Sequence, residues 1–259
     1  MTHRVDEVLR RGPSAALGAL LEVDVPDDVM PPLWHWVHLL EMAPQHLLGP
    51  DGHPTVGVPE APGPGRKRMF AGGRVTSREP LRYRVPATRT VAVADRAVKQ
   101  GSSGTLEFVT VRHEVTQNGR VCVVEEQDIV YRDGHSSLPP AVVAADRDRP
   151  PAAWTLPVDE RFLFRFSALT YNAHRIHYDA GWAAFEGYDG LVVHGPLQAL
   201  LMAEAARGAG ADLIGRTFGF RLQRALVGIQ DVSVGVEDAA GEGWVRGADG
   251  VVSARSRWL

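Results

Sequence analysis

One stretch in the second half restricts the fold most. Residues 195–208, GPLQALLMAEAARG, have the composition of a helix with apolar residues on nearly every side until Glu204. Such a helix is buried rather than laid on a surface. Three strand-like runs follow it, GFRLQRALV, GIQDVSVGV and GWVRGADGVVSARSRWL, and the last turns at Asp249-Gly250. A curved antiparallel sheet wrapped around one helix satisfies this order, because sheet and helix bury each other's apolar faces.

The first half has a similar order of elements. We expect a helix over residues 5–21, broken near Gly12-Pro13, and a largely buried helix over residues 31–43, PPLWHWVHLLEMA. Residues 49–66 are rich in Gly and Pro and predict a loop. Each half is therefore expected to combine one buried helix with several strands.

Strands are predicted from about Met69 onward. TLEFVTVRHEV and RVCVVEEQDIVYR flank Asn118-Gly119, a strong hairpin signal. After these strands, DGHSSLPPAVVAADRDRPPAAW has no sustained period and indicates a linker. The segment RFLFRFSALT, just beyond it, is interpreted as a short strand. The predicted boundaries are 1–135 for the first domain, 136–155 for the linker and 156–259 for the second domain.

The bulk composition excludes several classes of protein. The chain has 259 residues, 44% of them hydrophobic, which is enough to bury a core. Its formal net charge of -3 gives no basic footprint for nucleic acid. The single cysteine, Cys122, cannot form an intrachain disulfide and is expected to be a buried thiol. There is no secretory signal and no apolar run of the ~18 residues that a membrane span needs, so we expect a cytoplasmic protein.

The segment SALTYNAHRIHYD, residues 167–179, concentrates the chemistry. His174 and His177, with His194, could converge on a metal, but His-x-x-His without Cys is a weak signal and we predict no metal. A nucleophile is not favoured either, because Ser167 lacks a Gly-x-Ser-x-Gly context. Acid–base catalysis fits better: histidine exchanges protons near neutral pH, and the helix start HGPLQ offers N–H groups for an oxyanion.

This segment and the following GYDGLVVHGPLQALLM resemble the MaoC-like hydratases, and in particular the hydroxyacyl-thioester dehydratase type 2 branch with its mesaconyl-C4-CoA and itaconyl-CoA hydratases. RKRMFAGGRV, VKQGSSGTLEFVTVRHE and VVEEQDIVYR resemble that branch's N-terminal portion. The resemblance implies an α+β double hot-dog fold, with two curved antiparallel sheets, each wrapped around a central helix. The second half would be catalytic. Hot-dog folds tend to associate, so we expect a homodimer.

The resemblance also implies roles for individual residues. His177 matches the family's catalytic histidine, and the N–H of Gly195 matches the group that holds the thioester carbonyl. His174 stands where the common motif has asparagine. Asn172 stands in place of the catalytic aspartate, and because an amide cannot ionise, acid–base work would fall on His177, with His174 as a second candidate. Asn172 would position water or fix an imidazole tautomer. No metal or organic cofactor is implied.

Basic residues are candidates for binding the phosphates of the substrate's carrier. These are Arg66, Lys67, Arg68, Lys99 and Arg165. Tyr178 is a candidate wall of the substrate pocket, with simple packing as the alternative. His194 is also a candidate at the substrate site, with a structural hydrogen bond beside Gly195 as the alternative. Asp179 is expected to cap the helix that follows the motif.

The function expected from these residues is reversible hydration of an enoyl thioester, or dehydration of a 3-hydroxyacyl thioester. A hot-dog thioesterase and a non-catalytic acyl-CoA-binding subunit stay open as alternatives. The sequence does not identify the acyl chain, and it leaves both acyl-CoA and an acyl carrier protein thioester possible as substrate.

Overall fold

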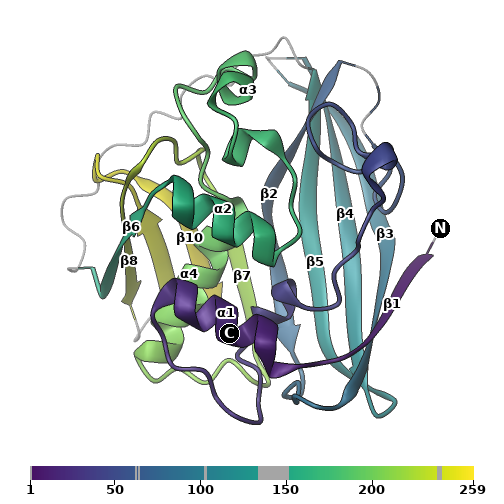
Figure 1. Ribbon diagram of the computed structural model, residues 1–259, viewed down its shortest axis with the longest axis vertical. Coiled ribbons are helices and arrows are strands. Elements are labelled where there is room, and N and C mark those ends of the chain that lie inside the picture. The colour runs from purple at the N-terminus through teal and green to yellow at the C-terminus, as the bar shows by residue number, and fades with distance from the viewer. Residues whose placement is uncertain (1, 62, 64, 102–103, 134–151, 238–240) are drawn as a thin grey trace.

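The strands form a single antiparallel sheet. The computed structural model describes residues 2–61, 63, 65–101, 104–133, 152–237 and 241–259. Within them the strand order is β1-β3-β4-β5-β2-β7-β10-β9-β8-β6, and pairing of β2 with β7 joins the two halves (Figure 1). The strands are β1 (Thr2–Val8), β2 (Arg66–Ser77), β3 (Pro86–Gly101), β4 (Gly104–Gln117), β5 (Arg120–Asp133), β6 (Trp154–Val158), β7 (Thr217–Leu222), β8 (Gln230–Glu237), β9 (Glu242–Arg246) and β10 (Val252–Trp258).

The second half confirms the predicted arrangement. Helix α4 (Gly195–Gly208) packs against β2, β7, β8, β9 and β10. Ten consecutive residues, Leu197 to Ala206, are buried, so the helix is enclosed on all sides along this length. Its enclosure follows from its composition, because an apolar surface all round has no stable place in water.

The segment RFLFRFSALT is helical, so the predicted strand is wrong. It lies in α2 (Glu160–Leu169), whose first turn is capped by Asp159 through a 2.8 Å hydrogen bond from the Phe162 N–H to the carboxylate. Phe162, Leu163 and Phe166 are buried, a helical spacing that outweighs the alternation of phenylalanines along the segment. A further short helix, α3 (Ala180–Phe185), follows the motif.

The predicted helix over residues 31–43 is also wrong. Only a 3₁₀ turn, η1 (Trp34–Val37), forms there, between Leu33 and Leu39, both of which have positive φ. Its two tryptophans form hydrogen bonds to different elements. The Trp34 indole N–H donates to Glu204 on α4, and the Trp36 indole N–H donates to Glu125 on β5. The segment is apolar on most sides because it is enclosed between α4 and the first-half sheet, not because it is a buried helix.

The N-terminus is divided between a strand and a helix. Residues 2–8 form edge strand β1, paired with β3, and only α1 (Arg11–Leu21) is helical, so the predicted helix from residue 5 begins too early. The helix also continues through Gly12-Pro13, because Pro13 falls in its first turn, where its missing N–H costs nothing. α1 packs against α2 and η1 (Figure 1).

The hairpin, the single cysteine and the linker were also predicted from the sequence. The hairpin at Asn118-Gly119 is confirmed, and both residues have positive φ as its turn requires. A second 3₁₀ turn, η2 (Gln45–Leu47), lies in the segment before the Gly- and Pro-rich loop. Cys122 is a buried free thiol. Most of the predicted linker lies outside the described residues. Among those residues, no helix has the length and apolar character to cross a membrane.

Candidate active site

The motif forms a short hydrogen-bonded loop between α2 and α3. The Asn172 amide oxygen accepts the N–H of His174 at 3.0 Å, and a 3₁₀ turn, η3 (Arg175–His177), follows. Asp179 caps α3 by accepting the Trp182 N–H at 3.0 Å, which confirms its predicted role. The loop thereby fixes the backbone that carries His174 and His177.

Four imidazoles stand in a row beside this loop, which we call the histidine row: His53, His174, His177 and His194. Successive ring centroids are 4.1, 5.4 and 3.6 Å apart. His174, His177 and His194 are buried, and His53 is partly buried. The convergence of the last three was anticipated from the sequence, whereas His53 comes from the first-half loop and was not.

His177 is held in one tautomer. Its Nδ1 lies 2.6 Å from the carbonyl oxygen of Val192, and because a carbonyl only accepts, Nδ1 carries the proton. The lone pair of Nε2 is then free to accept a proton from a ligand. Burial lowers the pKa of His177 to about 3, against the opposing effect of that hydrogen bond. The imidazole is therefore neutral at physiological pH.

His194 combines a structural hydrogen bond with a place in the row. Its Nε2 lies 2.8 Å from the Ser167 hydroxyl, and its ring stacks on His177 with 18° between the planes. Burial holds the pKa of His194 well below its ordinary value. The neutral ring packs against His177 without adding charge.

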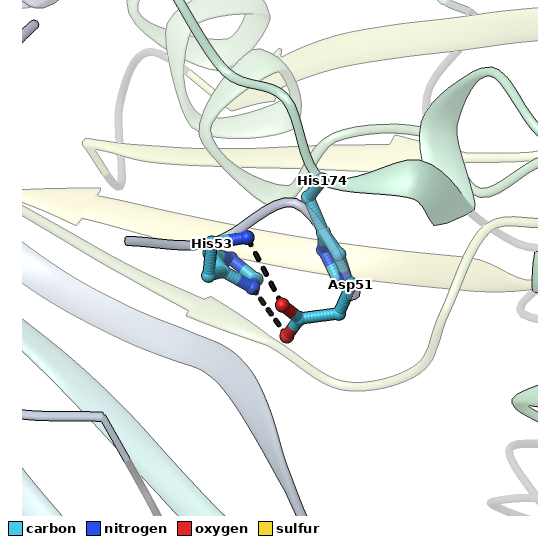
Figure 2. A group of neighbouring side chains, drawn as sticks. All are labelled: Asp51, His53 and His174. Carbon is cyan, nitrogen blue, oxygen red and sulfur yellow. Dashed lines mark hydrogen bonds and ion pairs between the residues drawn. The ribbon is translucent and has the colours of Figure 1, made fainter. Parts of the chain in front are cut away.

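A loop of the first half reaches the motif. The N–H of Arg175 donates to the Asp51 carbonyl at 2.9 Å. Figure 2 shows the Asp51 carboxylate accepting from both the N–H and Nδ1 of His53, each at 3.0 Å, with His174 alongside. Burial opposes ionisation of Asp51, but the hydrogen bonds and charge of His53 outweigh it and lower the pKa of the carboxyl to about 2. Burial lowers the pKa of His53 to about 4, against the effect of Asp51.

A second carboxylate lies beside the row. Glu186 Oε1 is 3.6 Å from His174 Nε2 and accepts from the Trp182 indole at 2.7 Å. Burial opposes its ionisation, but His174 and Trp182 together lower the pKa of Glu186. Asp51 and Glu186 thus place negative charge near His174, which in turn lies against His177.

Gly52 allows the two halves to approach at this point. Its φ is +91°, and a Cβ built on it would lie 1.8 Å from the carbonyl oxygen of Ala173. We expect Gly52→Ala to displace Asp51 and His53 and to lower kcat/KM by about 100-fold, since displacements near 1 Å have effects of that size. Gly63→Ala is the matched control, because Gly63 also has positive φ (+84°) but no atom within 4 Å of the added carbon. Equal kcat/KM for the two variants would contradict the expectation.

The cluster of Asp51, His53 and His174 has ligand atoms within 4.8 Å of one another, as a metal site would. However, both carboxylate oxygens of Asp51 already accept hydrogen bonds from His53. The positive charge of Arg68 also acts on His53, which disfavours a cation there. We therefore assign the cluster to proton chemistry and assign no metal to it.

Gly195 is the first residue of α4, directly after His194. A Cβ at this position would lie 2.4 Å from Leu222 Cδ1 and 3.1 Å from Phe70 Cδ1. The first N–H groups of a helix have no intrahelical acceptor and carry partial positive charge. The position of Gly195 is therefore consistent with the prediction, made from the sequence, of an N–H donor beside the histidines.

The other predicted binding residues are distributed unevenly. Lys67 donates to the Glu186 carbonyl at 2.8 Å, and Arg66 pairs with Glu107. The Tyr178 hydroxyl donates to the Ala173 carbonyl within the motif, and its side chain is half exposed. Two further positions are exposed: Lys99, near Phe108 on the first-half hairpin, and Arg165, on α2. Contacts of Lys99 and Arg165 with a carrier stay predictions.

Two curved halves of one antiparallel sheet, with a buried helix whose N-terminus meets the histidines, define a double hot-dog protein. The chain superposes on HtdX of Mycobacterium tuberculosis with a TM-score of 0.72, covering 100% of this chain and 99% of that one at 14% identity. A second M. tuberculosis protein, described as having a double hotdog fold, gives a TM-score of 0.58 at 13% identity, covering 100% of this chain and 96% of that one. These comparisons confirm the predicted fold class.

Sequence comparison then identifies the family. The profile of hydroxyacyl-thioester dehydratase type 2 matches residues 33–227. The chain is also 44% identical over 234 residues to the mesaconyl-C(4)-CoA hydratase of Chloroflexus aurantiacus, which covers 87% of this chain and 82% of that protein. The chain therefore belongs to the hydroxyacyl-thioester dehydratase type 2 family. It is a hydro-lyase that adds water to, or removes it from, acyl thioesters.

Proposed function

We propose that this hydro-lyase acts on a dicarboxylic enoyl-CoA of the mesaconyl-C4-CoA type, with His177 as general base. The observation that carries the proposal is the fixed tautomer of His177, whose unprotonated Nε2 belongs to a buried row next to the N-terminus of α4. The substrate class is supported by the 44% identity to the Chloroflexus aurantiacus hydratase.

The reaction proceeds by conjugate addition. The thioester carbonyl accepts the N–H of Gly195, which makes the β-carbon electrophilic and stabilises the enolate. His177 Nε2 takes a proton from water as the oxygen bonds to the β-carbon. The imidazolium then returns this proton to the α-carbon, so that H and OH add across the double bond. Dehydration is the reverse sequence.

Asp51 of the first half and Glu186 of the second half supply the negative charge that the motif lacks. Asn172 cannot ionise, and its amide oxygen is engaged with the His174 N–H, so it acts as a positioning residue. Asp51 and Glu186, both with lowered pKa, flank His174. Their negative charges stabilise the transient imidazolium on His177, because they flank His174 and the ring of His174 lies against that of His177. Both halves are then needed for turnover.

A panel of enoyl-CoA esters tests the function. We expect loss of the enoyl-thioester absorbance with mesaconyl-C4-CoA, and a lower kcat/KM with crotonyl-CoA, a longer trans-2-enoyl-CoA and itaconyl-CoA. A thiol reagent in parallel wells should detect no free CoA, because water attacks the β-carbon and not the carbonyl. Release of thiol would instead indicate a thioesterase. Binding without turnover across the panel would indicate a non-catalytic subunit.

Two further properties are proposed on the same basis. The carrier is CoA rather than an acyl carrier protein, as in the substrate that names the Chloroflexus aurantiacus relative. The homodimer expected for a hot-dog protein stays a prediction, and the mass measured by light scattering checks it.

A further inference from the structure

Within the described ranges, Arg68 differs from Arg66 and Arg74 of β2 in having no ion-pair partner. Arg66 and Arg74 on the same strand pair with Glu107 and Glu126. Among the residues that the structure describes, no carboxylate lies within ion-pair distance of Arg68, although Asp51 and Glu41 act on it from further away. Burial is the largest influence on its guanidinium and lowers the pKa, while the side chain keeps partial solvent access. Guanidinium nevertheless stays charged in proteins, so an unpaired one in this position is costly without a ligand.

The position of Arg68 relates it to the reacting atoms. Arg68 is opposite Tyr131, and Phe70, two residues on, is opposite Ile129, so all four side chains share one face of the sheet. The ring of Phe70 lies against Gly195, the proposed thioester site. Residues i and i+2 of a strand are about 7 Å apart. Arg68 is therefore the next residue along this face of β2 from Phe70, whose ring lies against the proposed thioester site.

Arg68 is also electrostatically coupled to His53, the member of the histidine row that comes from the first half. Its charge acts on His53, and Asp51 acts on it in return. Phe70 and Tyr131, together with Val91, Val109, Val111, Ile129 and Val58, form an apolar cluster on this part of the sheet. An acyl group that enters from Gly195 would thus meet an apolar wall that carries Arg68. A second cation, Arg89 of β3, shares this face of the sheet but is separated from Arg68 by β4 and β5.

We propose that Arg68 binds the free carboxylate of the acyl group and so selects dicarboxylic over monocarboxylic enoyl-CoA esters. The proposal rests on the proposed function. In a four-carbon dicarboxylic enoyl thioester the second carboxylate is attached to the β-carbon, the atom that water attacks. A guanidinium near the histidines can bind this carboxylate through two parallel hydrogen bonds and hold the β-carbon near His177. The CoA phosphates are a second possible anion for the same cation, and the test separates the two.

The test uses Arg68→Gln with reactive and unreactive ligands. The kcat/KM for mesaconyl-C4-CoA is expected to fall about 100-fold, the upper range for charge-assisted hydrogen bonds, whereas that for crotonyl-CoA stays within about twofold. Calorimetry with succinyl-CoA and butyryl-CoA, which have no double bond, should show the wild-type preference for succinyl-CoA disappearing in the variant. Arg68→Lys keeps the charge without the two-pronged geometry and should retain part of the preference. Arg74→Gln on the same strand is the control and should change neither ratio.

Equal losses with mono- and dicarboxylic esters would overturn the proposal and assign Arg68 to the CoA phosphates. An unchanged succinyl-to-butyryl preference in Arg68→Gln would overturn it as well. The binding arm does not depend on turnover. If the wild type hydrates no ester, the proposed function fails, and the binding ratio still decides the role of Arg68. Crotonyl-CoA turnover, or butyryl-CoA binding, shows that each variant is folded.

Discussion

Replacing His177 with glutamine is expected to lower kcat/KM about 1,000-fold, because it removes the general base of the proposed mechanism. Glutamine can still donate to the Val192 carbonyl, the bond that His177 Nδ1 makes at 2.6 Å. It cannot take a proton from water. The substitution therefore separates the chemical role of His177 from its structural one. The measurement is steady-state hydration of mesaconyl-C4-CoA, with crotonyl-CoA as second substrate.

His38→Gln is the matched control for this loss. His38 is also buried and its Nε2 is 2.8 Å from the Ser14 hydroxyl, but it packs with Tyr83 and α1, outside the histidine row. We expect its kcat/KM to stay within a few-fold of wild type once the protein is folded. A His177→Gln enzyme with near-normal rates would remove His177 from the mechanism. Equal losses in both variants would mean that buried histidines act here through stability alone.

The second half could be predicted from sequence because its local and global signals agree. Residues 195–208 are apolar all round, so they specify a buried helix, and the strands after them end at recognisable turns. The pair His174 and His177 could be identified because both lie in one short segment that carries a recognisable motif.

The first half could not be predicted as well because its contacts are distant in sequence. Trp34 and Trp36 look like a helix core, but their partners are 170 and 89 residues away. Asp51 and His53 lie in a Gly- and Pro-rich loop that carries no motif. What brings them to His174 is the close approach of Gly52 to Ala173, which no pattern within the loop reveals. The segment PDGHP contains the glycine that this approach needs, but nothing in it indicates that Ala173 is the residue approached.

The same loop shows why the substitution of asparagine for aspartate in the motif need not abolish activity. At position 172 the side chain holds the backbone of His174, a task for which an amide oxygen is sufficient. In the proposed mechanism the negative charge comes instead from Glu186 and from Asp51, whose loop in the first half also contacts Arg175. Positioning and charge, which one aspartate could provide together, are then divided among separate residues of both halves.

Acidification from pH 7 to pH 5.5 is expected to lower the free energy of unfolding by about 5 kcal/mol. Burial lowers the pKa of His38, His53 and His113 to about 4 and of His177 to about 3, and holds that of His194 well below its ordinary value. The unfolded chain binds protons at these positions below about pH 6.5. The folded chain does not until about pH 4. Stability therefore rises with pH through this interval, and each histidine contributes about 1 kcal/mol between pH 5.5 and 7.

Carboxylates do not account for this loss, because their window lies lower. The hydrogen bonds and charge of His35, with Gln127, outweigh burial and lower the pKa of Glu125 to about 2, and that of Asp51 is also about 2. Their contribution is complete above about pH 4.5 and is lost as the pH falls toward 2. Urea unfolding at half-unit steps from pH 7.5 to 4.5 measures the effect. His38→Gln should reduce the slope near pH 5.5 by nearly one proton, since it removes one of the five histidines. A stability that is flat between pH 7 and 5.5 would mean that these imidazoles are charged, or open to water, in the folded protein.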